Sequence, residues 1–147
     1  MADYHMQTII VGSHSPLSTP DSTAANFTQR LTDGIVLDGK WEACIRSITY
    51  PDGPVGKTVL IYCNELSASS VSGDPKRLFA RLPPTPPAPS ALLYYAQTST
   101  LLPWVAFPEN VVLNQLSFQL ADSDGVLLPV VGSDRTIIEL AIRQVRK

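Results

Sequence analysis

Charged residues are scarce in this sequence. They make up 16% of the 147 residues, against about 25% in an average soluble domain. Lysine and arginine number 11 against 13 aspartates and glutamates, a net charge of -2. That balance argues against a dedicated nucleic-acid-binding protein, which carries a basic surface. The one basic cluster lies at the C-terminal end (Arg143, Arg146 and Lys147) and is typical of a solvated tail. The low charge leaves two interpretations, a surface buried in an assembly or an uncharged polar surface.

Cysteine and histidine are also rare. The two cysteines, Cys44 and Cys63, are too few for a disulfide framework, and we expect both to be reduced and packed. His5 and His14 lie near no cysteine cluster and no pair of carboxylates, whereas a metal site needs three or four ligands at set spacing. We therefore expect neither a metal nor another cofactor.

Long apolar runs are absent. No stretch reaches the roughly 18 apolar residues of a membrane helix, and residues 1–12 lack the basic and apolar regions of a signal peptide. The expectation is a protein without membrane insertion, made and used inside a cell or released only by lysis. The length predicts a single domain, residues 1–147.

Catalytic motifs are missing or incomplete. Residues 53–58, GPVGKT, end like a phosphate-binding loop, but that loop needs glycine where Pro51 stands and a helix where an apolar strand pattern follows. No G-x-S-x-G elbow occurs. The DSDG stretch at residues 122–125 resembles part of a calcium loop, and a hairpin turn is the better interpretation. We therefore expect a protein that is not an enzyme. A small hydrolase stays as the last-ranked alternative, since the members of a Ser-His-Asp site are neighbours in space and not in sequence.

Short strand patterns are what the sequence does contain. Residues 41–50 predict one uninterrupted strand that Pro51 ends, with Trp41, Ala43, Ile45, Ser47 and Thr49 on one face. Further strands are predicted at residues 6–11, 27–31, 58–64, 77–82, 92–97, 104–107, 114–121, 126–131 and 136–145, with a separate apolar piece at residues 34–39.

Short strand patterns with Gly and Pro between them, and no convincing long helix, predict an all-β fold. The expected architecture is an antiparallel β-sandwich, specifically a single jelly roll of about eight strands. The proline-rich residues 83–89 predict a stiff extended loop, with a ligand for a proline-recognising module as the alternative. The densest aromatic region contains Tyr94, Tyr95 and Trp104, which we predict as protein-interface residues. Core positions remain an equal alternative for them.

One order of residues is similar to a known family. It consists of an Asn-Phe-Thr start, a leucine, an apolar residue before glycine, Trp-Glu, and an alternating strand that ends in Tyr-Pro. Here the order is carried by Asn26, Phe27, Thr28, Leu31, Leu37, Gly39, Trp41, Glu42, Ile48, Tyr50 and Pro51. It resembles virion proteins of Polinton (Maverick) and adintovirus-type elements. Residues 60–74, 77–83 and 116–143 resemble the same family in the same order, and the stretch from residue 83 to residue 104 departs from it.

This resemblance implies a structural protein of the virion of a tailless double-stranded DNA virus. The implied role is a capsid vertex (penton) protein that assembles with copies of itself, a pentamer being favoured, and contacts the major capsid protein. A minor or cement capsid protein and a receptor-binding spike domain remain alternatives. A cellular carbohydrate- or ligand-binding β-sandwich module is the alternative from another class.

Overall fold

The computed structural model describes residues 6–51, 58–66, 78–82, 92–96, 104–130 and 135–145, and of residues 51 and 92–96 it describes the backbone alone. These parts of the chain contain strands and turns and no helix, so none of their segments is a helix long and apolar enough to span a membrane. The strands are β1 (Met6–Gly12), β2 (Asn26–Leu37), β3 (Trp41–Pro51), β4 (Val59–Cys63), β5 (Leu78–Leu82), β6 (Leu92–Ala96), β7 (Val105–Ala106), β8 (Val111–Asp122) and β9 (Ile137–Gln144).

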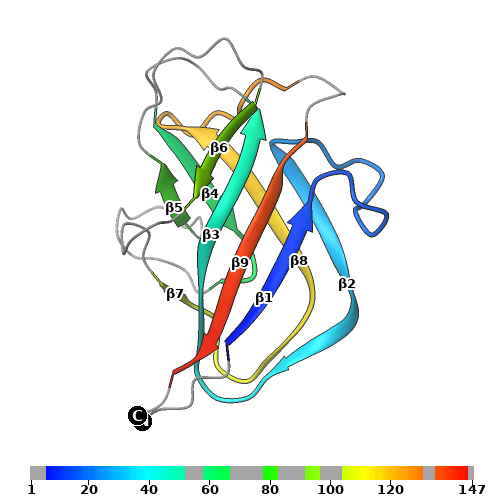
Figure 1. Ribbon diagram of the computed structural model, residues 1–147, viewed down its shortest axis with the longest axis vertical. Helices are drawn as coiled ribbons and strands as arrows, with labels where there is room; N and C mark the ends of the chain where they lie inside the picture. The colour runs from blue at the N-terminus through cyan, green and yellow to red at the C-terminus, as the bar shows by residue number, and fades with distance from the viewer. Residues whose placement is uncertain are drawn as a thin grey trace.

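The strands form two antiparallel sheets that pack face to face (Figure 1). The first sheet has the order β1-β9-β3-β6, with the short β7 also paired to β3, and the second has the order β2-β8-β4-β5. Apart from β4 and β5, successive long strands lie in opposite sheets. This is the strand order of a jelly roll, so the predicted β-sandwich is confirmed.

The core lies between the two sheets and is built by the inward faces of their strands. Leu116, Phe118 and Leu120 of β8 alternate inward as predicted, and each is at most 1% exposed. The Phe118 ring lies between two others, with centroids 5.5 Å from Phe27 and 6.3 Å from Phe79. Strands β2, β8, β4 and β5 supply this side of the core, and β3 and β9 supply most of the other.

The prediction of an uninterrupted alternation in β3 is wrong. Trp41, Ala43 and Ile45 face the core as expected. The register against β9 then shifts, because Ile45 pairs with Leu140 and Ser47 pairs with Glu139. Arg46 is therefore an extra residue, a β-bulge, and everything after it turns to the other face. As a result Ile48 and Tyr50 enter the core, each 1% exposed.

Strand β2 also differs from its prediction. Residues 27–31 and 34–39 were expected to be separate pieces, whereas Asn26–Leu37 is one strand with an irregularity between Arg30 and Ile35. Four residues of β2 oppose the single Asn114 of β8 there, and β2 bends strongly (Figure 1). A Cβ atom at Gly34 would lie 2.8 Å from the Asn114 Oδ1 atom, so the exposed Asn114 side chain would have to move aside for a larger residue there.

The chain after β8 makes a tight turn, as predicted for residues 122–125. The Asp122 carboxylate accepts hydrogen bonds from the backbone N–H groups of Asp124 (2.9 Å) and Val126 (3.1 Å), and Gly125 has a φ of 84°. The predicted strand at residues 126–131 is wrong over its described part, residues 126–130, where only Leu127 pairs, as an isolated bridge to Ala121. The Leu128 N–H still donates to the Leu120 carbonyl at 3.0 Å, but the next residue is Pro129, which cannot donate to a ladder.

The other predicted strands, at residues 6–11, 58–64, 77–82, 92–97, 104–107 and 136–145, are confirmed with ends that shift by at most two residues. The predicted strand at residues 114–121 begins three residues earlier, at Val111. The two cysteines are free and buried, as predicted, and lie in different sheets. The predicted loop at residues 83–89 lies outside the described residues.

Candidate functional site

The three predicted interface residues lie along one edge of β3. Tyr94 and Tyr95 belong to β6 and pair with Thr49 and Ile48 of β3. Trp104 directly precedes β7, which pairs with β3 at Glu42 and Ala43. Because β9 occupies the other edge of β3 along its length, β6 and β7 share the remaining edge. The side chains of Tyr94 and Tyr95 lie outside the described residues, and their interface role stays a prediction.

The Trp104 side chain takes part in a charged contact on the outer face of the first sheet. The Arg143 guanidinium carbon lies 3.8 Å from the Trp104 ring centroid, close enough for a cation–π interaction. Arg143 also donates from Nε to the Glu42 carboxylate at 2.5 Å, directly across the β3–β9 pair. Trp104 is half-buried. Its ring thus lies on the outer face of the sheet and not in the core between the two sheets.

The buried Cys44 thiol faces the same side of the first sheet, next to Ala141 of β9. Burial raises the pKa of the Cys44 thiol, and the positive charges of Arg46 and Arg143 lower it by less. Burial also raises the pKa of the Cys63 thiol well above its ordinary range. Thiols react as thiolates, so both cysteines are suited to packing and not to nucleophilic chemistry. Within the described ranges, no three histidine, cysteine, aspartate or glutamate side chains gather as a metal site.

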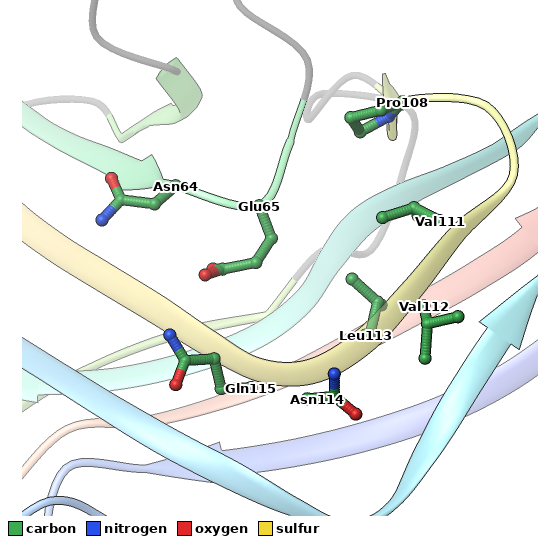
Figure 2. Close-up of a pocket in the computed structure, with 8 residues that line it drawn as sticks. All are labelled: Asn64, Glu65, Pro108, Val111, Val112, Leu113, Asn114 and Gln115. Carbon is green, nitrogen blue, oxygen red and sulfur yellow. The ribbon is translucent and has the colours of Figure 1, made fainter.

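A groove of about 510 Å³ lies where the turn after β4 meets the beginning of β8 (Figure 2). The side chains around it combine one carboxylate, three amides and four apolar residues. They belong to Asn64, Glu65, Pro108, Val111, Val112, Leu113, Asn114 and Gln115. Glu65 is the one charged residue among them.

Glu65 extends the β4–β8 ladder with its side chain. Strand β4 ends at Cys63, and the next backbone N–H, that of Asn64, donates to the Ser117 carbonyl at 3.1 Å. The Ser117 N–H then donates to the Glu65 Oε1 atom at 2.6 Å. A carboxylate oxygen thus takes the place of the backbone carbonyl that a longer β4 would have supplied.

Burial of the Glu65 carboxyl opposes its ionisation. Loss of water raises the pKa of Glu65 above its ordinary value of 4.5, and the hydrogen bond from Ser117 N–H lowers it by less. A carboxyl group whose pKa is raised by folding stabilises the folded state below its unfolded pKa. That contribution is lost as pH rises through the folded pKa.

We therefore expect Glu65→Gln to change the pH dependence of stability. Glutamine keeps an oxygen for the Ser117 N–H but does not ionise. From about pH 4 to about pH 7 the free energy of unfolding should fall more in the wild type than in Glu65→Gln, as measured by urea titration at each pH. The exposed Glu109, which pairs with Lys40 at 3.7 Å on the surface, supplies the matched control Glu109→Gln. Parallel pH curves for wild type and Glu65→Gln would contradict the expectation.

No pattern in the sequence pointed to this groove. Glu65 is a lone acidic residue after a strand, and it meets Asn114 and Gln115 only through the pairing of β4 with β8. The carboxylate can accept hydrogen bonds from hydroxyl groups or pair with a cationic side chain, and the amides can both donate and accept hydrogen bonds. Hydrogen bonding and charge pairing are therefore the interactions that the groove offers.

Comparisons with known proteins leave the family open. No family model and no curated protein matches the sequence. Among solved structures, the chain is similar to a subunit of the virus-like particle of extra small virus from the giant freshwater prawn Macrobrachium rosenbergii. The match covers 100% of this chain and 83% of that chain, at 7% identity and a TM-score of 0.24. A superposition of that quality carries no argument about function.

Proposed function

We propose that this chain is a structural protein of a virion, a jelly-roll subunit that acts by assembly and not by catalysis. The observation that carries the proposal is the strand order, β1-β9-β3-β6 packed on β2-β8-β4-β5. Viral capsid proteins are among the main users of this double-sheet arrangement, together with lectin domains and cupins. Because a fold hosts several functions, the surface has to support the choice among them.

Exposed apolar side chains on both outer faces support assembly. On the first sheet Ile10 and Ile137 are 62% and 51% exposed and lie diagonally across the β1–β9 pair. On the second sheet Val36 and Val112 are 60% and 52% exposed and lie directly opposite each other. Clustered apolar side chains of this kind mark contact surfaces. The low charge of the whole sequence points the same way, since charged residues are depleted in interface centres.

Within the virion, the proposed role is that of the capsid vertex. A vertex protein forms a closed ring in which each copy contacts the next through two different surfaces. Its outer surfaces then meet the major capsid protein. The edge of β3 that carries β6 and β7, with Trp104 and its Arg143 partner, is the surface that we assign to these contacts. The resemblance of residues 26–51 to virion proteins supports this role over the lectin and cupin alternatives.

Sedimentation and native mass spectrometry of the purified chain test the proposed role. The expected species has five times the mass of the 16.0 kDa subunit, and the chain should be recovered from purified particles together with the major capsid protein. A trimer would favour the spike alternative. A monomer with no affinity for other virion components would refute the proposed function.

A carbohydrate-binding module is the second candidate, and the groove at Glu65 favours it. One carboxylate and the amides of Asn64, Asn114 and Gln115 are suited to the hydroxyl groups of a sugar. A glycan array followed by a thermal-shift titration would detect it. Binding of a specific glycan that Glu65→Gln and Gln115→Ala both weaken, in a chain that forms no assembly, would place the protein in this class.

A further inference from the structure

Strand β1 is an edge strand of the first sheet, with β9 on one side (Figure 1). Its register with β9 runs from Met6 opposite Arg143 to Gly12 opposite Ile137 without a shift. The seven residues, MQTIIVG, include neither a charge nor a proline. Regular, uncharged and apolar edges of this kind are templates for pairing with another strand.

The hydrogen bonds at the end of β1 show which backbone groups point outward. The Gly12 N–H donates to the Gln29 side chain at 2.8 Å, and the Gly12 carbonyl accepts from the Ser18 hydroxyl at 2.5 Å. Both groups therefore point away from β9. In an antiparallel ladder this direction alternates with every residue, so the N–H and C=O groups of Met6, Thr8 and Ile10 also point outward. Among the described residues, none pairs with these groups.

Within the described residues, the edges of the second sheet are protected in ways that β1 is not. Strand β2 carries Arg30 and a register shift. Residues 17–19 cover the free edge of its first part, because the Thr19 N–H donates to the Thr28 carbonyl and the Arg30 N–H donates to the Leu17 carbonyl. Strand β5 carries the exposed Arg81 and pairs with β4 through another register shift. Charges, bulges and covering segments are the usual means by which sheet edges avoid pairing.

We propose that the β1 strands of two copies pair antiparallel across a twofold axis at Thr8. In this register Met6 lies opposite Ile10 of the second copy, and the two Thr8 residues face each other. All three side chains are exposed on the outer face of the sheet, so each pair places apolar next to apolar or threonine next to threonine. Such cross-strand pairs are favourable, and the strand is self-complementary as a twofold contact requires.

This contact goes beyond the proposed function and is separate from it. A twofold pair joins two copies through the same surface, whereas a closed ring uses two different surfaces of each copy. The β1 pair would therefore join two free subunits or two rings. Pairing uses the open edges of both copies, so the product is a closed pair and not a growing fibre.

Proline at position 8 gives the sharpest test. The Thr8 N–H points outward and makes no bond within its own sheet, so Thr8→Pro removes a donor that only a second strand would use, at an edge where proline is tolerated. Thr8→Val is the matched control because it keeps the N–H. Two single strands that pair bury little surface, and small interfaces are weak, so sedimentation should be followed from about 10 to about 300 µM. We expect wild type and Thr8→Val to form pairs and Thr8→Pro to lose pairing by at least about tenfold, with thermal unfolding as the check on folding.

A charge exchange tests the register without relying on proline. Ile10→Lys should weaken pairing, and adding Met6→Glu to the same chain should restore it, since position 6 of one copy faces position 10 of the other. Within each chain the new charges lie opposite Glu139 and Arg143 of β9, so they do not oppose folding.

Three results would overturn the inference. They are a wild type that forms no pairs, a folded Thr8→Pro chain that associates as the wild type does, and a double variant that does not recover. A pentamer unaffected by all these changes would leave the proposed function standing while refuting the β1 pair. Conversely, a β1 pair in a chain that never enters particles would refute the proposed function alone.

Discussion

Phe118→Ala should lower the free energy of unfolding by about 3 to 5 kcal/mol, the usual cost of emptying a buried aromatic position. Phe118 is 0% exposed and its ring stacks between Phe27 and Phe79. The substitution removes both ring contacts and leaves a cavity that residues from three different strands, β2, β5 and β8, would have to fill. Urea denaturation monitored by circular dichroism measures the change.

The control for this prediction lies on the same strand. Gln115 is exposed, and Gln115→Ala should change the free energy of unfolding by no more than about 0.5 kcal/mol. If Phe118→Ala cost as little as Gln115→Ala, the ring would not lie in a packed core, and the assignment of inner and outer faces of the second sheet would be wrong.

Deleting Cys44 should prevent folding or strongly destabilise the protein. Without Cys44, Ile45 would take the outward place next to Ala141 and Arg46 the inward place next to Leu140, because a one-residue slip reverses the faces. The alternative, which keeps the bulge at Arg46, turns Trp41 and Ala43 out of the core. Either arrangement removes a large apolar side chain whose burial is worth about 1.5 to 3 kcal/mol, and the first also buries a charge.

Deleting Arg46 is the matched control, because it removes the extra residue of the bulge itself. Ser47 would then follow Ile45 and still pair with Glu139, so that Ile48 and Tyr50 keep their places in the core. We expect this variant to fold and to lose no more than about 1 kcal/mol of unfolding free energy. Soluble yield, thermal unfolding and a proton–nitrogen NMR spectrum of both deletions measure the difference. A well-dispersed spectrum and an unchanged unfolding temperature for the Cys44 deletion would contradict the assignment of Arg46 as the extra residue.

Most strands could be predicted from local pattern, and the failures have a common cause. Residues 114–121 and 136–145 alternate regularly, and the structure places one alternating set of each in the core, namely Leu116, Phe118, Leu120, Ile138, Leu140 and Ile142. Residues 41–50 alternate just as well in the sequence, yet Arg46 breaks their alternation in the sheet. A bulge is a property of two strands together, because it exists only as a mismatch between β3 and β9. The bend of β2 against Asn114 is hidden for the same reason.

The candidate surfaces were predicted less completely than the strands. Aromatic composition pointed to Trp104, but not to its contact with Arg143, which lies 39 positions along the chain and reaches Trp104 through the pairing of β3 with β7 and β9. The groove at Glu65 gave no local signal. Its side chains come from a turn after β4 and from β8, and hydrogen bonding between these segments is what places the carboxylate beside the amides.

Local periodicity and composition were therefore enough to establish an all-β chain with a low charge, its main inward-facing residues and the absence of recognisable catalytic motifs. Those properties depend on each residue and its near neighbours, because alternation along a strand is a local consequence of extended backbone geometry. Register, the assignment of strands to sheets and the choice of the open edge needed the assembled sandwich. They depend on hydrogen bonds between segments that lie far apart in the chain, such as β1 with β9. The side of β1 that no described residue pairs with could be recognised only once β9 was known to occupy the other side.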